Sequence, residues 1–429
     1  MGVLLSFVFL ALLLVTASLI YWCSVSAKYT QPERADEIHT VTTPDLWKIR
    51  LFRYRPVRGR GEPVFLCHGM FGNRFNYTLP AGMSLVDTLI AKGYDCWVID
   101  LRGTRSSTPP FGRSRTEVTM DGYLNADLPT AIDYVLQSTG YPKVHWVGHS
   151  MGGMLLYAYE EAFGNAQIAS GVTLGSPPGF AGASFRVPGF LLQLLNLFPG
   201  TLNTVLRALT PLASKVSLMQ KFAPTNWDNM NPSLGSGALF NMLDTMPPRV
   251  AEALSSAVQT NTLVLKKLDG TDVDVIGGLN ALHTPLFAIY GAKDPFVAFG
   301  TAQRFFDELP GKDKKMMVLS EENGFVEDYS HVDLTFSRDG KAEVYEPIGD
   351  WITAHATSVQ APVEPKAAAK KAPAKRAPAK KAAAATVPAE KKPAAKKKAV
   401  ASKKPAAKKK AAGAEPESPT VKSGAESIG

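Results

Sequence analysis

The stretch Gly148-His149-Ser150-Met151-Gly152 decides which fold the sequence predicts. Residues 144–147 before it are β-rich, and residues 152–162 after it have the composition of a helix. A G-x-S-x-G pattern between a strand and a helix is typical of a nucleophilic serine on a sharp turn, where Gly148 and Gly152 leave room for the backbone. The serine is then exposed at a helix N-terminus, whose amides face developing negative charge. The alternative is an ordinary glycine turn.

A serine hydroxyl is a weak nucleophile alone, so a base and an orienting acid are expected later in the chain. In this arrangement the acid and then the histidine follow late strands of the sheet. Asp294 directly follows one late apolar run, and His331 follows the next, as the one histidine of seven in the required place. We therefore expect Asp294 to orient His331, and His331 to take the Ser150 proton. The acids that could replace Asp294 are Asp328 and Asp333.

An oxyanion hole needs two backbone N–H groups beside the serine. The amide of Met151 is expected to be one of them, and the loop at 68–72, after an early apolar strand, is expected to supply the other through Met70. His68 precedes the serine in the chain and is expected to brace this loop. His149 is expected to be a packed or hydrogen-bonded residue and not a proton shuttle.

The surrounding sequence alternates short apolar runs with helical stretches. Uniformly apolar strands flanked by helices predict an α/β fold with a mostly parallel sheet that carries helices on both faces. The predicted strands are residues 64–67, 96–100, 144–147, 172–174, 286–290 and 316–319, and the clearest helices are residues 126–137 and 152–162.

An insertion of about a hundred residues, 176–284, separates two of these strands, and it is too long for an ordinary connecting loop. It is predicted to form a small helical cap or lid over the sheet edge. The alternatives are an insertion that merely packs, or apolar side chains that lie on a membrane surface. Its apolar character is strongest at Phe190, Leu191, Leu192, Leu194, Leu195, Leu197 and Phe198.

The N-terminus predicts a membrane-inserted segment. Residues 1–27 contain no charged side chain, and residues 3–22 form an apolar run close to the roughly 20 residues that cross a bilayer. We expect a single-pass transmembrane anchor. The alternative is a signal peptide, because Val25 and Ala27 form a small-x-small cleavage pattern before Lys28. Cleavage there would leave a secreted protein. The chain has only three cysteines, Cys23, Cys67 and Cys96, which excludes a disulfide framework. It has no Cys/His pairs at the spacing of metal ligands, so a structural zinc site is not expected.

The C-terminus differs from the rest of the chain in composition and charge. Residues 361–429 hold 18 Lys+Arg and five Glu, so they carry +13 of a total net charge of +9 in 429 residues and leave −4 for the remainder. Lysine, alanine and proline cannot form a core, so this basic tail is predicted to be disordered. Its expected partner is a polyanion, either nucleic acid bound without sequence specificity or anionic lipid. The alternative is a soluble tether.

These residues resemble the gastric and lysosomal acid lipases of the α/β-hydrolase superfamily. The likeness spans about residues 36–175 and 285–335, and the resemblance implies the same roles for Ser150, Asp294 and His331. The family tends to have Gln where this chain has Met151, and its paired cysteines are absent here, so its lysosomal or gastric setting is not implied. The segments that carry the likeness are Val41-Thr42-Thr43-Pro44-Asp45, His68-Gly69-Met70, Ser84-Leu85, Gly93-Tyr94-Asp95, Arg102-Gly103, Asp127-Leu128-Pro129 and His331-Val332-Asp333.

The sequence therefore predicts an α/β-hydrolase core at residues 33–175 and 285–356, between the anchor and the tail. The resemblance implies a lipase-like serine ester hydrolase for hydrophobic acyl esters, with no cofactor and no metal. A thioesterase, polyester depolymerase or acyltransferase would share the same residues. The alternative from another class is a catalytically silent scaffold that tethers nucleic acid or a granule to a membrane through the tail.

Overall fold

The computed structural model of the protein describes residues 2–59, 61–184, 197, 199–213, 215–216, 224–230 and 232–357. The apolar run at 190–196, together with Phe198, and the basic tail at 361–429 lie outside these residues, so the predictions made for them remain predictions.

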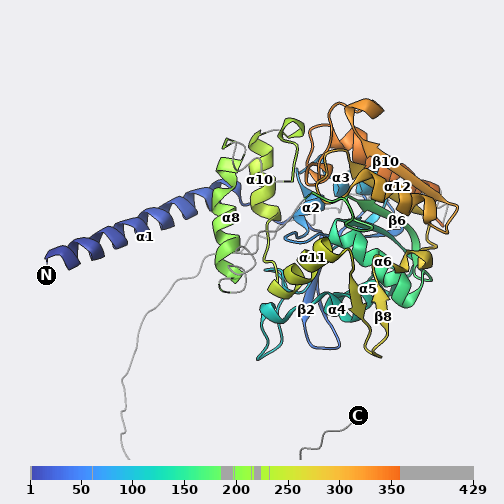
Figure 1. Ribbon diagram of the computed structural model, residues 1–429, viewed down its shortest axis with the longest axis horizontal. Helices are drawn as coiled ribbons and strands as arrows, with labels where there is room; N and C mark the ends of the chain where they lie inside the picture. Colours follow the sequence, from blue (N-terminus) through green and yellow to red (C-terminus); the bar gives the residue numbers. More distant parts are fainter. Residues whose placement is uncertain are drawn as a thin grey trace, which may run out of the picture. The chain divides into compact units, whose positions relative to one another are not determined.

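A sheet with helices around it forms the centre of the fold (Figure 1). Its eight strands lie in the order β1-β2-β4-β3-β5-β6-β9-β10. The six strands from β4 to β10 are parallel, whereas β2 pairs antiparallel with both β1 and β4. The prediction of a mostly parallel sheet is thus confirmed. The strands are β1 Glu37–Thr42, β2 Lys48–Tyr54, β3 Pro63–Cys67, β4 Asp95–Asp100, β5 Val144–His149, β6 Ile168–Leu174, β9 Leu286–Gly291 and β10 Lys314–Leu319.

Two apolar layers cover the two faces of the sheet. Side chains alternate along β3, so that Phe65 and Cys67 face one layer and Val64 and Leu66 face the other. The first layer is built with helices α5 and α6, and the second with α3 and α13. These helices are α3 Leu85–Ala91, α5 Leu128–Thr139, α6 Met151–Phe163 and α13 Glu346–Ala354, and the others of the core are α2 Phe75–Thr78, α4 Met120–Gly122 and α12 Phe299–Glu308.

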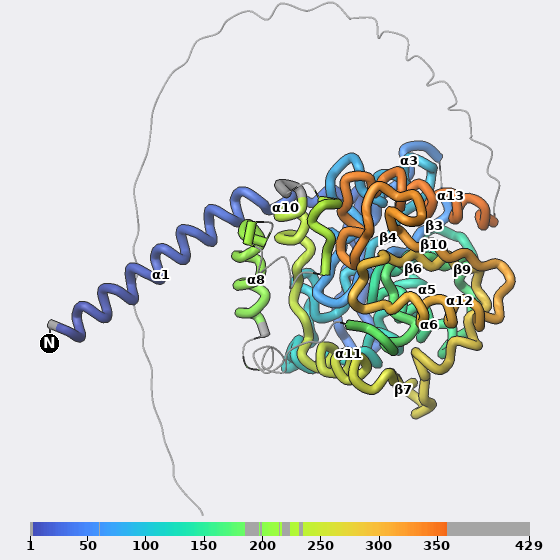
Figure 2. The backbone as a smooth tube through the Cα atoms, turned by 45° about the horizontal axis from the view of Figure 1, so that its top comes forward, coloured from blue at the N-terminus to red at the C-terminus, as the bar shows by residue number. Residues whose placement is uncertain are grey.

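The insertion divides into two parts. Helices α8 (Pro199–Ala213) and α10 (Pro232–Met242) pack on each other at one side of the core (Figure 2), and α10 also packs on α2. Helix α11 (Pro248–Thr260) and a hairpin of β7 (Val264–Lys266) and β8 (Asp272–Asp274) instead bury apolar side chains in the first core layer. The second half of the insertion is therefore part of the main core and contains strands, which differs from the small helical cap that the sequence predicted.

A single long helix, α1 (Gly2–Tyr29), precedes the core and is long and apolar enough to cross a membrane. Its first two thirds are exposed, and its C-terminal end contacts α8 and α10 (Figure 1). The structure thus places the insertion beside the end of this helix.

Candidate active site

Ser150 lies on a sharp turn between β5 and α6. Its backbone has φ 54° and ψ −122°, a conformation that non-glycine residues rarely adopt. A Cβ on Gly148 would overlap the carbonyl of Gly152, and a Cβ on Gly152 would overlap the carbonyl of Cys67. Both glycines are therefore required for β5, α6 and the end of β3 to approach one another, and the held strain presents the Ser150 side chain at the start of α6.

His331 and Asp294 form a buried hydrogen-bonded pair. The Nδ1 atom of His331 lies 2.8 Å from Oδ2 of Asp294, and the side chain of Asp294 has no exposed surface. A carboxylate only accepts, so Nδ1–H donates and Nε2 is left free of a proton to act as a base. Gly175 makes room for the pair, because a Cβ there would come within 3.0 Å of both bonded atoms.

The pair lies beside the serine turn. His149, the residue before Ser150, donates from Nε2 to the backbone carbonyl of His331 at 3.1 Å, and the two rings are 4.8 Å apart. The Ser150 N–H donates to Leu174 O at 2.8 Å, directly before Gly175. The structure thus brings together the three residues that the sequence selected from distant positions.

The two alternative acids have other partners. The Asp333 carboxylate accepts from the N–H groups of Ser330 and Asn226 and from Asn229 Nδ2, which ties the insertion to the His331 loop. Burial raises the pKa of Asp333 above its ordinary value, although these hydrogen bonds act against it. Asp328 pairs with Lys293 at 3.2 Å. Asp294 is therefore the one of the three acids bonded to His331.

Two further histidines near the serine have fixed structural partners. Burial, together with the neighbouring imidazole of His331, lowers the pKa of His149 to about 3. Its Nδ1 accepts from Asn76 Nδ2 at 3.2 Å. His68 donates from Nδ1 to Gly69 O at 2.8 Å and accepts at Nε2 from the Leu101 N–H at 3.2 Å. Both rings are saturated by these bonds, which fits bracing and not proton transfer.

The loop that carries Met70 lies directly against the serine. A Cβ on Gly69 would be 2.9 Å from Cβ of Ser150, and Phe71, after Met70, has a left-handed φ of 60°. Met151 is the first residue of α6. The loop that carries Met70 and the first residue of α6 therefore both lie next to Ser150.

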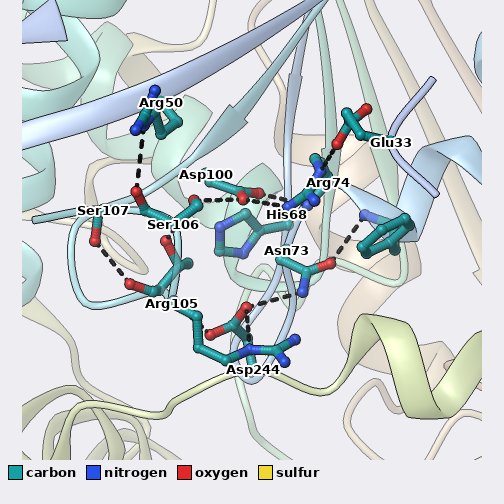
Figure 3. Close-up of polar contacts among 12 residues, drawn as sticks. Glu33, Arg50, His68, Asn73, Arg74, Asp100, Arg105, Ser106, Ser107 and Asp244 are labelled. Carbon is teal, nitrogen blue, oxygen red and sulfur yellow. Dashed lines mark hydrogen bonds and ion pairs between the residues drawn. The ribbon is translucent and has the colours of Figure 1, made fainter. Parts of the chain in front are cut away.

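Polar contacts from three parts of the chain hold this loop, as Figure 3 shows. The buried carboxylate of Asp244, from the insertion, accepts from Asn73 Nδ2 and from the Arg105 N–H, both at 2.8 Å. The Asp244 N–H donates to Phe71 O at 2.7 Å. The sequence did not single out Asp244, because nothing in its neighbourhood distinguishes it from a solvated helix-end acid.

A second set of contacts ties the same loop to β4 and to the segment after α1. The carboxylate of Asp100 accepts from the Arg74 N–H at 2.6 Å, from Arg74 Nη1 at 2.9 Å and from Ser106 Oγ at 2.6 Å (Figure 3). Arg74 also pairs with Glu33. Burial would raise the pKa of Glu33, but the Arg74 guanidinium and the backbone N–H groups of Ala35 and Arg34 together outweigh burial and hold this pKa below its ordinary value. Both residues stay charged, so the loop is held by ion pairs as well as packing.

Within the described part of the chain, no group of three or more His, Cys, Asp or Glu side chains is arranged to hold a metal ion. The chemistry that this arrangement supports is that of a serine nucleophile activated by a neutral imidazole, with backbone amides beside it.

Comparisons with known proteins find lipases among those that this chain is similar to. Lipase 1 of Drosophila melanogaster is 33% identical over 130 residues, 27% of this chain and 27% of that protein. Gastric triacylglycerol lipase of Bos taurus is 33% identical over 129 residues, 27% of this chain and 32% of that protein. Triacylglycerol lipase 2 of Arabidopsis thaliana is 22% identical over 361 residues, 75% of this chain and 85% of that protein. The predicted resemblance to the gastric lipases is thereby confirmed for part of the chain.

The match to the two animal lipases spans about a third of their length or less. A family model described as alpha/beta hydrolase fold matches residues 62–329, which include the serine turn and most of the sheet. The chain belongs to the α/β-hydrolase family.

Proposed function

We propose that the protein is a lipase-like serine hydrolase that cleaves carboxylic esters of hydrophobic acyl groups. The observation that carries this proposal is the buried 2.8 Å bond between His331 Nδ1 and Asp294 Oδ2 beside the strained turn of Ser150. The names of the relatives, which are lipases, support the same class of reaction.

The proposed reaction has two halves. His331 Nε2 takes the hydroxyl proton as Ser150 Oγ attacks the ester carbonyl, and the oxyanion is held by the N–H groups of Met70 and Met151. The tetrahedral intermediate collapses, and the alkoxide leaves with the proton from His331. Water then attacks the acyl-enzyme with His331 again as base, releasing the acid and restoring the serine. Asp294 keeps the imidazole in the required tautomer throughout.

Apolar side chains around the site support a hydrophobic acyl group. The Phe296 ring lies 4.5 Å from the His331 ring. Met70 and Phe71 pack on Met246 and Ala251 of the insertion, as Leu202 does, and Val332 packs in a second insertion cluster. Removing an acyl chain from water contributes about 0.8 kcal/mol per methylene, so such surroundings favour long chains over acetyl groups. In this proposal α8 and α10 are the cap over the acyl chain.

We also propose that α1 is a retained single-pass anchor and not a cleaved signal peptide. The cleavage pattern at Val25 and Ala27 lies inside the continuous helix, and Val25 is buried. Asn241 of α10 donates to Tyr29 O at 2.7 Å and accepts from the Gln31 N–H at 3.0 Å. These two bonds hold the chain directly after the cleavage pattern. Cleavage would remove Trp22, whose ring packs 6.0 Å from Phe240.

The test is ester turnover by the full chain in detergent, on p-nitrophenyl esters from acetyl to palmitoyl. Ser150→Ala is compared with Ser170→Ala, which removes a buried hydroxyl in β6 that lies 2.8 Å from His145 Nδ1. We expect turnover that increases with acyl length and is lost in Ser150→Ala alone. No turnover on any ester, or equal turnover in wild type and Ser150→Ala, would contradict the proposal and favour the scaffold.

A further inference from the structure

The apolar length of α1 fixes where a bilayer would end. Residues 3–22 form its apolar run, and 20 helical residues span about 30 Å, the thickness of a hydrocarbon core. Tyr21 and Trp22 close this run, and aromatic residues of this kind concentrate at the level of the lipid headgroups. Whatever contacts Tyr21 and Trp22 therefore lies at the membrane surface.

Helix α8 makes that contact. Tyr21 Oη donates to the backbone carbonyl of Ala208, in the middle of α8, at 2.8 Å. The Arg207 guanidinium lies 5.5 Å from the Trp22 ring centroid and 4.2 Å from that of Phe240 in α10. In Figures 1 and 2, α8 runs across the end of α1 while the rest of α1 projects away from the core.

The outer face of α8 is uncharged and exposes two large apolar side chains. Val205 and Leu212 are two helical turns apart, so they lie on one face, and they are 46% and 41% exposed. Thr201 and Thr204 are also exposed, and the helix contains a single charged residue, Arg207. Arg207 is turned inward and donates from Nε to Phe240 O at 2.9 Å, and burial lowers its pKa to about 10. A surface helix in water ordinarily carries charges on its outer face.

The inner face of α8 faces the loop beside the candidate active site across a shared apolar cluster. Leu202 packs on Met246 and Ala251, and Met70 and Phe71 of the loop next to Ser150 pack on the same two residues. One face of α8 is therefore directed toward that loop, and the opposite face is exposed.

We propose that α8 lies in the membrane interface beside α1, with the face that bears Val205 and Leu212 in contact with lipid acyl chains. An interfacial helix of this kind is buried by roughly 5–10 Å. This docking surface would bring the proposed active site to the lipid and let a hydrophobic ester enter without crossing water. The inference rests on α1 being a membrane anchor, and does not depend on the ester chemistry.

The test is the depth of single fluorophores in the full chain reconstituted in phosphatidylcholine vesicles. In a Cys23→Ser background, whose remaining cysteines are buried, a polarity-sensitive probe is attached to Val205→Cys or Leu212→Cys. Leu13→Cys, in the middle of the apolar run, reports whether α1 is inserted. Leu268→Cys is the matched control, because it is an exposed leucine, 90% accessible, in the turn between β7 and β8.

We expect lipids brominated near the headgroup to quench the probes at 205 and 212, lipids brominated near the chain ends to quench the probe at 13, and neither to quench the probe at 268. Quenching at 13 without quenching at 205 and 212 would overturn the docking surface and leave the anchor intact. No quenching at 13 would overturn the anchor and the docking surface together. Turnover of a water-soluble ester by the same labelled proteins tests the proposed chemistry separately.

Discussion

At the scale of single residues, the proposed chemistry depends on the tautomer of His331. The carboxylate of Asp294 accepts from Nδ1, which leaves Nε2 as the base. An asparagine at this position would offer its amide nitrogen to Nδ1 or reverse the tautomer, and either change removes the base.

We therefore expect Asp294→Asn to lower kcat by about 10⁴-fold with little change in KM, the size of effect seen when an orienting acid loses its charge. Asp328→Asn is the matched control, since Asp328 is the acid paired with Lys293, and it should retain near wild-type turnover. Steady-state kinetics on one p-nitrophenyl ester checks both. Equal losses in the two variants would assign the effect to loop structure and not to the tautomer.

The lowered pKa of His149 predicts that the free energy of unfolding decreases at acid pH. Its pKa is about 3 in the folded protein and about 6.5 when unfolded, so the unfolded state binds the proton more readily. Its stabilising contribution is complete above pH 6.5 and is lost as the pH falls toward 3, by about 1.4 kcal/mol for each pH unit.

The free energy of unfolding, measured with denaturant at about pH 4.5 and about pH 7.5, should show this loss, and His149→Gln should show a smaller difference between the two values. An unchanged pH dependence in His149→Gln would mean that other groups set the acid limit.

At the scale of elements, the loop that carries Met70 is positioned by a residue far away in sequence. Asp244 accepts from Asn73 and Arg105 and donates to Phe71 O. An amide in place of the carboxylate would present a donor to a donor, and the loop would shift relative to Ser150.

We expect Asp244→Asn to lower kcat by about 10- to 100-fold, because small displacements of positioning groups have effects of this order. Glu160→Gln is the matched control, since Glu160 is a buried carboxylate that accepts the N–H groups of His283 and Thr284 away from the site. Both variants should lose stability in thermal unfolding, but only Asp244→Asn should lose kcat in the protein that remains folded. A parallel loss of kcat in both would remove the positioning role.

The elements that the sequence predicted correctly are those whose signal is local. Strands β3 to β6 and β9 are almost fully buried, so each appears as an apolar run. The edge strand β10 is only partly buried, but it ends in the apolar run Met316-Met317-Val318-Leu319. Strand β1 alternates more and less exposed side chains, and β2 mixes buried apolar residues with partly exposed basic ones, so this antiparallel pair carries no uniform apolar run. The hydrogen bond from His331 to Asp294 followed from chain order alone. Asp244 could not be found in this way, because its role depends on how the insertion packs.

At the scale of the whole molecule, the separation of charge suggests that catalysis and polyanion binding reside in different parts of the chain. The tail at 361–429 carries +13 and the remainder −4. A chain of lysines without aromatic side chains neutralises phosphates without stacking on bases, so its binding is expected to be independent of nucleotide sequence and steeply dependent on salt.

Deletion of residues 361–429 should therefore leave ester turnover unchanged and abolish binding to double-stranded DNA and to anionic lipid vesicles. For the full chain, the affinity for DNA should fall by about 10³-fold or more between roughly 50 and 200 mM salt, if six or more phosphates are contacted. Fluorescence anisotropy with two unrelated DNA sequences measures the salt dependence of DNA binding and its independence of sequence. Sedimentation with anionic vesicles shows whether the tail binds lipid as well as nucleic acid. Loss of turnover on deletion would show that the tail contributes to catalysis. Retained DNA binding would show that residues outside the tail bind the polyanion, which the net charge of −4 on those residues does not predict.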